Sequence, residues 1–118
     1  MQERRCIPRW QVNKKAGLTF ENGVKPMLCV VEDINACGMR VSLSKELFPE
    51  AFSNFNLDLD NGCAFDASAR VAWSESAYER NIYGLSFNRI DEPAKNRIAR
   101  YIQDNFPAEM IKRAWRGV

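Results

Sequence analysis

Three arginines lie within the first nine residues of the sequence, at Arg4, Arg5 and Arg9. Guanidinium groups form paired hydrogen bonds to phosphate oxygens and to the O6/N7 edge of guanine, and they stack on flat π-systems. Arg5 and Arg9 have the spacing R-x-x-x-R. Because a basic N-terminal stretch is most often a solvated tail, the rest of the chain must indicate whether these side chains have a ligand.

A second polar segment, Asp33-Ile34-Asn35-Ala36-Cys37-Gly38, follows an apolar run and reads as a short turn. An aspartate accepts hydrogen bonds only, which suits the N1–H and N2–H donors of guanine, and Gly38 would let the backbone approach a ligand closely. Arginines, a carboxylate and a glycine turn together suit a guanine nucleotide with exposed phosphates. The alternative is that Asp33 and Asn35 are turn formers that bond the local backbone.

The net charge of +2 is small, but its distribution is uneven. Residues 1–15 carry five basic side chains and one acidic (+4), residues 16–88 carry five and ten (−5), and residues 89–118 carry seven and four (+3). Positive potential is therefore concentrated at the two ends of the chain, where a small anion could bind. The acidic middle argues against a nucleic-acid duplex lying across the surface.

Several classes of protein are disfavoured by what the chain lacks. It has no histidine, so Ser-His and Cys-His triads are excluded, and its four cysteines have no C-x-x-C spacing that indicates zinc. We therefore expect reduced thiols, no metal, no cofactor and no enzymatic activity. Nothing resembles a signal peptide or a membrane span, which predicts a cytoplasmic protein without membrane insertion.

Apolar residues alternate along the middle of the chain, which predicts β-strands. The expected strands cover residues 10–20, 24–34, 39–43, 55–59, 63–73 and 82–87. Asn22-Gly23 predicts a two-residue turn between the first two strands, and residues 44–54 predict a loop with a helical turn. In the fifth strand the alternation places Trp73 on the core-facing side. Six strands joined by turns predict an antiparallel sheet, and closing it into a barrel would remove its exposed edges.

The periodicity changes after Arg89. Ile98, Ile102 and Phe106 recur at every fourth position and predict an amphipathic helix, which Pro107 ends or kinks. We expect one domain over residues 1–118. It would consist of a flexible arginine arm (1–9), a β-barrel (10–89) and a C-terminal helical segment (91–116).

R-x-x-x-R followed by D-x-N-x-x-G resembles the motif pair of the PilZ domain, a bacterial receptor for cyclic di-GMP. The resemblance continues into YGLSF at 83–87 and into the helix, and it covers nearly the whole chain. It implies a mainly β fold, a six-stranded antiparallel split barrel with a C-terminal α-helix, in agreement with the pattern of strands. It also implies a role in second-messenger signalling.

The resemblance carries over to individual residues. It implies that Arg5 and Arg9, with Arg4 beside them, clamp the phosphates and stack on a guanine, and that Asp33 reads guanine. Gly38 matches the family's glycine, whereas Asn35 stands where the family usually has serine, a departure that we expect to weaken or reshape binding. Some PilZ domains have an aromatic residue at the ligand late in the barrel, and Trp73 is a further candidate for this contact.

The function that follows is a nucleotide-binding receptor. Cyclic di-GMP would order the arginine arm against the barrel, and the changed surface would be offered to an unidentified downstream protein. One alternative is a PilZ-like interaction domain that does not bind the nucleotide. Another is an oligonucleotide-binding barrel, which predicts a basic face with stacking aromatics that the acidic middle does not supply, so no nucleic-acid partner is expected.

Overall fold

The computed structural model describes residues 10–21, 23, 25–59 and 62–105. Strands form where apolar residues alternate, and a helix forms where the period lengthens. Within the described residues the elements are β1 (Trp10–Phe20), β2 (Met27–Asn35), β3 (Gly38–Leu43), η1 (Pro49–Ser53), β4 (Phe55–Asp58), β5 (Ala64–Ala77), β6 (Arg80–Arg89) and α1 (Glu92–Asn105). The arginine arm and the end of the predicted helical segment, from residue 106 onward, lie outside the described residues.

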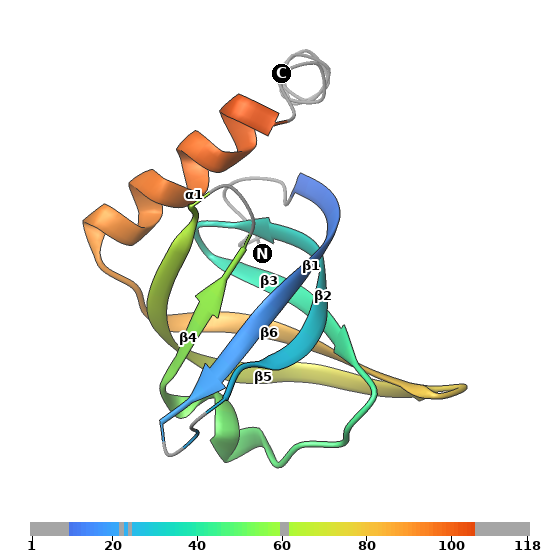
Figure 1. Ribbon diagram of the computed structural model, residues 1–118. Coiled ribbons are helices and arrows are strands. Elements are labelled where there is room, and N and C mark those ends of the chain that lie inside the picture. Colours follow the sequence, from blue (N-terminus) through green and yellow to red (C-terminus); the bar gives the residue numbers. More distant parts are fainter. Residues whose placement is uncertain (1–9, 22, 24, 60–61, 106–118) are drawn as a thin grey trace, which may run out of the picture.

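The six strands that the structure describes form one closed antiparallel barrel in the order β1-β2-β3-β6-β5-β4 (Figure 1). Closure comes from β1, which pairs with β2 on one side and with β4 on the other. Every pair of neighbouring strands is antiparallel, which confirms the predicted fold class. In the part of the chain described here, no helix is long and apolar enough to span a bilayer.

Two helical segments cover opposite ends of the barrel (Figure 1). At one end α1 buries Ile98 and Ile102, and the Asp91 carboxylate accepts a hydrogen bond from Ala94 N (2.9 Å) that caps its first turn. At the other end η1 inserts Phe52, which is fully buried. The residues buried by α1 and η1 extend the interior formed by inward-facing strand residues, so the barrel has a packed core.

The Phe52 ring contacts three other rings at its end of the barrel. The ring centroids of Phe20, Tyr83 and Phe55 lie 5.7, 5.4 and 6.0 Å from that of Phe52. Such tilted or edge-on pairs contribute about 0.5–1.5 kcal/mol each beyond the area that they bury. The loop with a helical turn predicted over residues 44–54 is confirmed, because η1 lies between the end of β3 and the start of β4. Its Phe52 is a core residue.

The hairpin turns differ from the prediction in two places. The connection between β1 and β2 is longer than the two-residue turn predicted at Asn22-Gly23, because β1 ends at Phe20 and β2 begins only at Met27. In contrast, Ala77 pairs with Arg80, so the β5–β6 hairpin has a two-residue loop that the sequence did not indicate. This hairpin is longer than expected and projects beyond the barrel (Figure 1).

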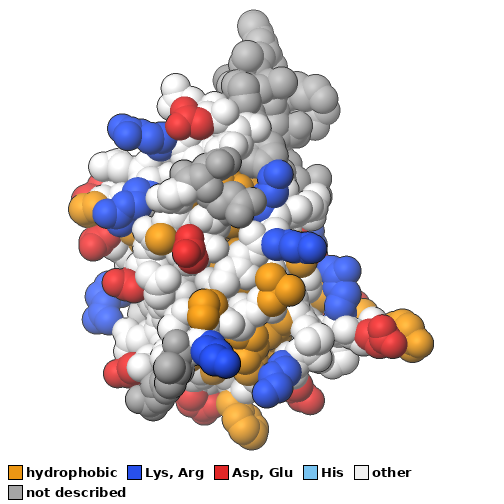
Figure 2. Space-filling model, viewed as in Figure 1, with side chains coloured by type: hydrophobic (Ala, Val, Ile, Leu, Met, Phe, Trp, Pro, Cys, Tyr) orange, Lys and Arg blue, Asp and Glu red, His pale blue; other side chains and the backbone are white. Residues whose placement is uncertain are grey.

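Basic side chains are distributed widely on the face seen in Figure 2. Lys and Arg side chains are spread among acidic ones, and several hydrophobic side chains gather near the middle of this face. Nucleic-acid binding surfaces usually concentrate basic residues in a patch or stripe. The described residues on this face show no such stripe.

Candidate functional site

The structure places the second predicted motif beside the start of the barrel. Trp10 begins β1 and pairs with Ile34, and Gln11 pairs with Asp33. The described chain therefore begins next to the Asp33–Gly38 segment. Arg4, Arg5 and Arg9 precede Trp10 in the sequence and lie outside the described residues.

A β-bulge in β2 sets the direction of Asp33. Val31 pairs with Val41 and Asp33 pairs with Arg40, so Glu32 is an extra residue with no pairing partner on β3. A bulge of this kind leaves two residues of one strand facing one residue of the other and re-aims the side chains around it. Glu32 and Asp33 both reach the side chain of Arg40 as a result.

The burial pattern shows the effect of this extra residue. Cys29 and Val31 face the core before the bulge, and Ile34 faces it afterwards. Uninterrupted alternation would have directed Asp33 into the barrel, where an ionised carboxylate is very costly. With Glu32 inserted, the side chain of Asp33 lies on the outer face, although the residue is only 7% exposed.

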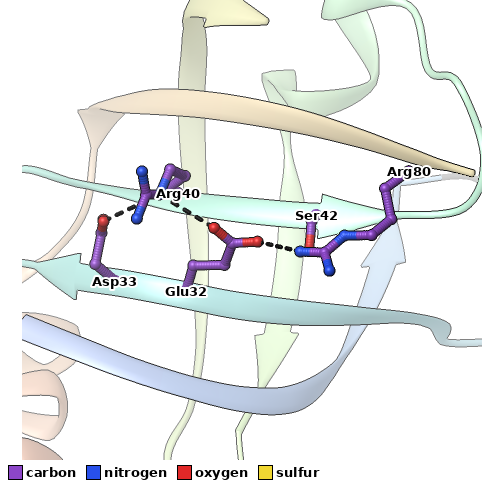
Figure 3. Close-up of polar contacts among 5 residues, drawn as sticks. All are labelled: Glu32, Asp33, Arg40, Ser42 and Arg80. Carbon is purple, nitrogen blue, oxygen red and sulfur yellow. Dashed lines mark hydrogen bonds and ion pairs between the residues drawn. The ribbon is translucent and has the colours of Figure 1, made fainter. Parts of the chain in front are cut away.

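Asp33 forms an ion pair with Arg40 that Glu32 shares (Figure 3). Arg40 Nε lies 3.2 Å from Asp33 Oδ2 and 3.3 Å from Glu32 Oε1. The guanidinium thus lies between two carboxylates and is not aligned with one of them. Arg40 remains partly accessible, with 34% of its side chain exposed.

Glu32 is held from its other side by Arg80, the first residue of β6 (Figure 3). Arg80 Nη2 contacts Glu32 Oε2 and also donates a hydrogen bond to Ser42 Oγ (3.0 Å). The Arg80 side chain covers Ser42, which is 2% exposed although it alternates with core-facing neighbours. The two acids and two arginines of this group balance in charge.

Asn35 and Gly38 have clear structural roles in the turn between β2 and β3. The Oδ1 atom of Asn35 accepts hydrogen bonds from Cys37 N (2.7 Å) and Gly38 N (3.1 Å). Asn35 is therefore a turn former, as one interpretation of the sequence held. Gly38 needs its lack of a side chain because a Cβ atom there would lie 2.2 Å from the carbonyl oxygen of Leu85.

Trp73 is not in the core, so the prediction that it faces the interior is wrong. It is 40% exposed, because a second irregularity in register lies between Val71 and Trp73 and turns the indole to the outer face. The indole covers Gly84: a Cβ atom there would lie 2.2 Å from Trp73 Nε1. An indole on the outer face can contact a ligand, whereas an indole in the core could not. Trp73 is therefore a stronger candidate for a ligand contact than the sequence predicted.

Cross-strand pairing aligns the candidate residues in two rows on the outer face. Directly opposed residues of antiparallel strands share a face of the sheet. Across β2, β3, β6 and β5, one row is Asp33, Arg40, Gly84 and Trp73, and the next is Asn35, Gly38, Ser86 and Arg70. The predicted residues that the structure describes therefore lie together.

These rows also add Arg40 and the exposed Arg70, which the sequence interpretation had not included. Glu32 and Arg80 were missed as well, since they are far apart in the sequence. The one local signal is the break in alternation between Val31 and Ile34, which indicates a bulge. Among the described residues, no cluster of three or more His, Cys, Asp or Glu could hold a metal.

Comparisons with known proteins bear on this arrangement. The family model described as PilZ domain matches residues 3–104. Escherichia coli YcgR in complex with c-di-GMP matches with a TM-score of 0.67 and 14% identity, covering 98% of this chain and 51% of that one. MrkH of K. pneumonia matches with a TM-score of 0.63 and 18% identity, covering 95% and 54%.

A structure of MrkH in its apo state matches with a TM-score of 0.59 and 16% identity. At these identities the likeness is one of fold. The chain spans about half the length of the solved chains that it matches. A comparison with curated proteins finds no significant match.

Proposed function

The chain belongs to the PilZ domain family, and from this premise we propose that it is a receptor for cyclic di-GMP. Its site would have two halves, the arginine arm with Arg4, Arg5 and Arg9 and the outer face around Asp33. The pairing of Trp10 with Ile34 carries the proposal, because it brings the residue that follows Arg9 next to the Asp33–Gly38 segment. YcgR, which shares the fold, is bound to c-di-GMP in its solved structure.

The charges of the described half support the need for the arm. Glu32 and Asp33 balance Arg40 and Arg80, so this group would not by itself attract a ligand with two phosphates. Arg70 adds one positive charge on the same face. The phosphates would therefore take most of their partners from Arg5 and Arg9, while Asp33 would accept hydrogen bonds from guanine.

The outer face also offers flat surfaces for a base. Trp73 lies over Gly84 with its indole partly exposed, and Arg40 is opposite Gly84 on the neighbouring strand. Bases stack on aromatic rings such as indole with a gain of about 1–3 kcal/mol per base, and arginine adds cation–π contacts. We propose that a guanine stacks at this position, and that Asn35 and Gly38 shape the adjoining turn.

Binding would order the arm, and ordering costs about 1–2 kcal/mol per residue, which several charge-assisted hydrogen bonds must exceed. The ordered arm would form part of a surface for a downstream protein. The alternative is an interaction domain that acts without a ligand. The projecting β5–β6 hairpin, in which Tyr78 is 88% exposed, favours a contact with another protein under either proposal.

Calorimetric titration with cyclic di-GMP tests the proposal. We expect the wild type to bind and Arg5→Ala, Arg9→Ala and Asp33→Ala each to weaken binding by roughly 10- to 100-fold, the cost of a lost charge-assisted hydrogen bond. Arg97→Ala and Asp104→Ala, at exposed positions of α1, are matched controls and should bind like wild type.

Four measurements separate the alternatives. A wild type that releases no heat would refute the receptor and favour the interaction domain. Unchanged binding by Arg9→Ala would refute the arm's role even if the ligand is correct. Cyclic di-AMP serves as a base control, since adenine lacks the N1–H and N2–H donors that Asp33 would read, and single-stranded DNA tests the oligonucleotide-binding alternative.

A further inference from the structure

Four charged side chains on the outer face form a chain of alternating sign. Its order is Arg80, Glu32, Arg40, Asp33, and Glu32 is the shared member: Oε2 contacts Arg80 and Oε1 lies 3.3 Å from Arg40 (Figure 3). The carboxylates of Glu32 and Asp33 are the most enclosed members, with 14% and 10% of their side chains exposed. Contacts in this group are therefore screened less by water and salt than ordinary surface pairs.

Because the Arg40 guanidinium is shared between Glu32 and Asp33, its contact with Asp33 depends on Glu32. Arg40 Nε is almost equidistant from the two carboxylates, at 3.2 Å from Asp33 and 3.3 Å from Glu32. If the charge on Glu32 were removed, Arg40 would have Asp33 as its remaining anionic partner in this group. A guanine donor would then have to displace a more tightly held guanidinium.

We propose that Glu32 is a positioning residue for the ligand-reading carboxylate of Asp33, and that it acts through Arg40. This inference rests on the proposed binding of cyclic di-GMP. Glu32 draws Arg40 partly away from Asp33, so the Asp33 carboxylate can exchange that contact for guanine N–H donors. Arg80 acts one step further away, because its guanidinium fixes the direction of the Glu32 side chain.

The bulge makes this arrangement possible. In a regular strand, Glu32 and Asp33 would point to opposite faces of β2. The extra residue brings both side chains to Arg40 on β3. Two neighbouring carboxylates on one face repel each other unless a cation lies between them, and Arg40 occupies that place.

The first test needs no ligand. The Nε–Hε group of Arg40 gives a proton–nitrogen NMR signal, which Arg40→Lys would identify by removing it. Arg80→Ala and Glu32→Gln should each shift this signal, although Arg80 reaches Arg40 only through Glu32. Arg100→Ala, an exposed position on α1, is the control and should leave it unmoved. An Arg40 signal that is unchanged in Arg80→Ala would contradict the proposed link from Arg80 through Glu32 to Arg40.

The second test is the affinity for cyclic di-GMP, measured after thermal melting has shown that each variant is folded. Glu32→Gln, nearly identical in shape, should weaken binding by about fivefold and Arg80→Ala by about threefold, less than the tenfold that 1.4 kcal/mol would give. Glu92→Gln, whose side chain is 78% exposed, is the matched control and should bind as wild type does. Wild-type affinity in Glu32→Gln would overturn the proposal.

A double variant separates positioning from a merely structural role. With Arg40→Gln already present, Glu32→Gln should change the affinity no further, because Glu32 is proposed to act only through Arg40. Arg40→Met, which is also uncharged, provides a second background if Arg40→Gln folds poorly. Independent, additive losses would refute the mechanism. If the wild type binds no cyclic di-GMP, the proposed function fails and the positioning role fails with it, whereas the NMR test still decides whether Arg80 and Glu32 hold Arg40.

Discussion

Gly38 lies against the backbone of Leu85, and no side chain fits between them. A Cβ atom at Gly38 would lie 2.2 Å from the Leu85 carbonyl oxygen and 3.3 Å from its carbonyl carbon. Gly38 begins β3, and it pairs with Ser86 of β6. The glycine of the second motif is thus required by the approach of two strands, whether or not a ligand contacts it.

Gly38→Ala should lower the free energy of unfolding by about 2 kcal/mol, because the obstacle is backbone and cannot rotate away. Urea denaturation measures this loss. Gly62→Asn is the control: Gly62 has φ 77°, a Cβ atom there would have no neighbour within 4 Å, and asparagine tolerates positive φ. The control should change stability by less than about 0.5 kcal/mol. A Gly38→Ala variant as stable as wild type would contradict the close approach of Gly38 to Leu85.

Asn35→Ala should destabilise the protein by about 1 kcal/mol, because the turn loses the acceptor for Cys37 N and Gly38 N. Asn35→Ser, which keeps a shorter acceptor, should lose less. Asn56→Ala is the matched control, since its side chain makes an exposed hydrogen bond to Asp66. Equal losses for Asn35→Ala and Asn56→Ala in urea denaturation would show that the turn does not depend on the amide.

Gly84→Ala should displace the indole of Trp73 with little loss of stability, because the obstacle is a mobile side chain. The fluorescence of Trp73 should shift to longer wavelength as the ring leaves the sheet. Trp73→Phe identifies its part of the spectrum, which Trp10 and Trp115 also contribute to. If the indole supports a base, Gly84→Ala should also weaken cyclic di-GMP binding by several-fold. An unchanged spectrum would show that the ring does not rest on Gly84.

The stability of the barrel should fall in alkaline solution because of its buried thiols. Burial raises the pKa of Cys29 from 9.0 to about 12 and the pKa of Cys63 to about 11. Below pH 9 both the folded and the unfolded chain hold these protons. Above it only the unfolded chain releases them, so the free energy of unfolding falls by about 1.4 kcal/mol per thiol for each pH unit.

Urea denaturation between about pH 8 and about pH 10.5 measures that slope. Cys29→Ala should reduce the slope by the contribution of one thiol, whatever the substitution does to stability at neutral pH. The comparison of slopes cancels the titration of lysines and tyrosines that both proteins share. An identical slope in the variant would show that Cys29 does not contribute to the loss of stability at alkaline pH.

Much of the fold could be predicted because its strands obey a local rule. Alternating apolar residues locate most of β3, β4 and β5, and the fourfold spacing of Ile98 and Ile102 locates α1. The β5–β6 turn could not be found in this way. It consists of Tyr78 and Glu79 and lacks the Asn-Gly signal, and Glu79 adopts φ 59° without being glycine.

The candidate site was only half predictable. Asp33, Asn35 and Gly38 are close in the sequence and could be recognised as a motif. Arg80 of β6 joins Glu32 of β2 across the intervening strand β3, and no local pattern relates them. The interior placement of Trp73 was wrong for a similar reason, because an irregularity in pairing with β6 overrides alternation within β5.

The bulge at Glu32 makes β2 one residue longer than a regular strand would need at this point. Substitutions along the strand leave the count intact, so Asp33 continues to face outward and Ile34 inward. Loss of Glu32 alone would remove the bulge and restore regular alternation, with Val31 and Ile34 still facing inward and Asp33 still facing outward. Deletion of that one codon should therefore leave the strand's inward and outward faces intact and remove only the second carboxylate beside Arg40.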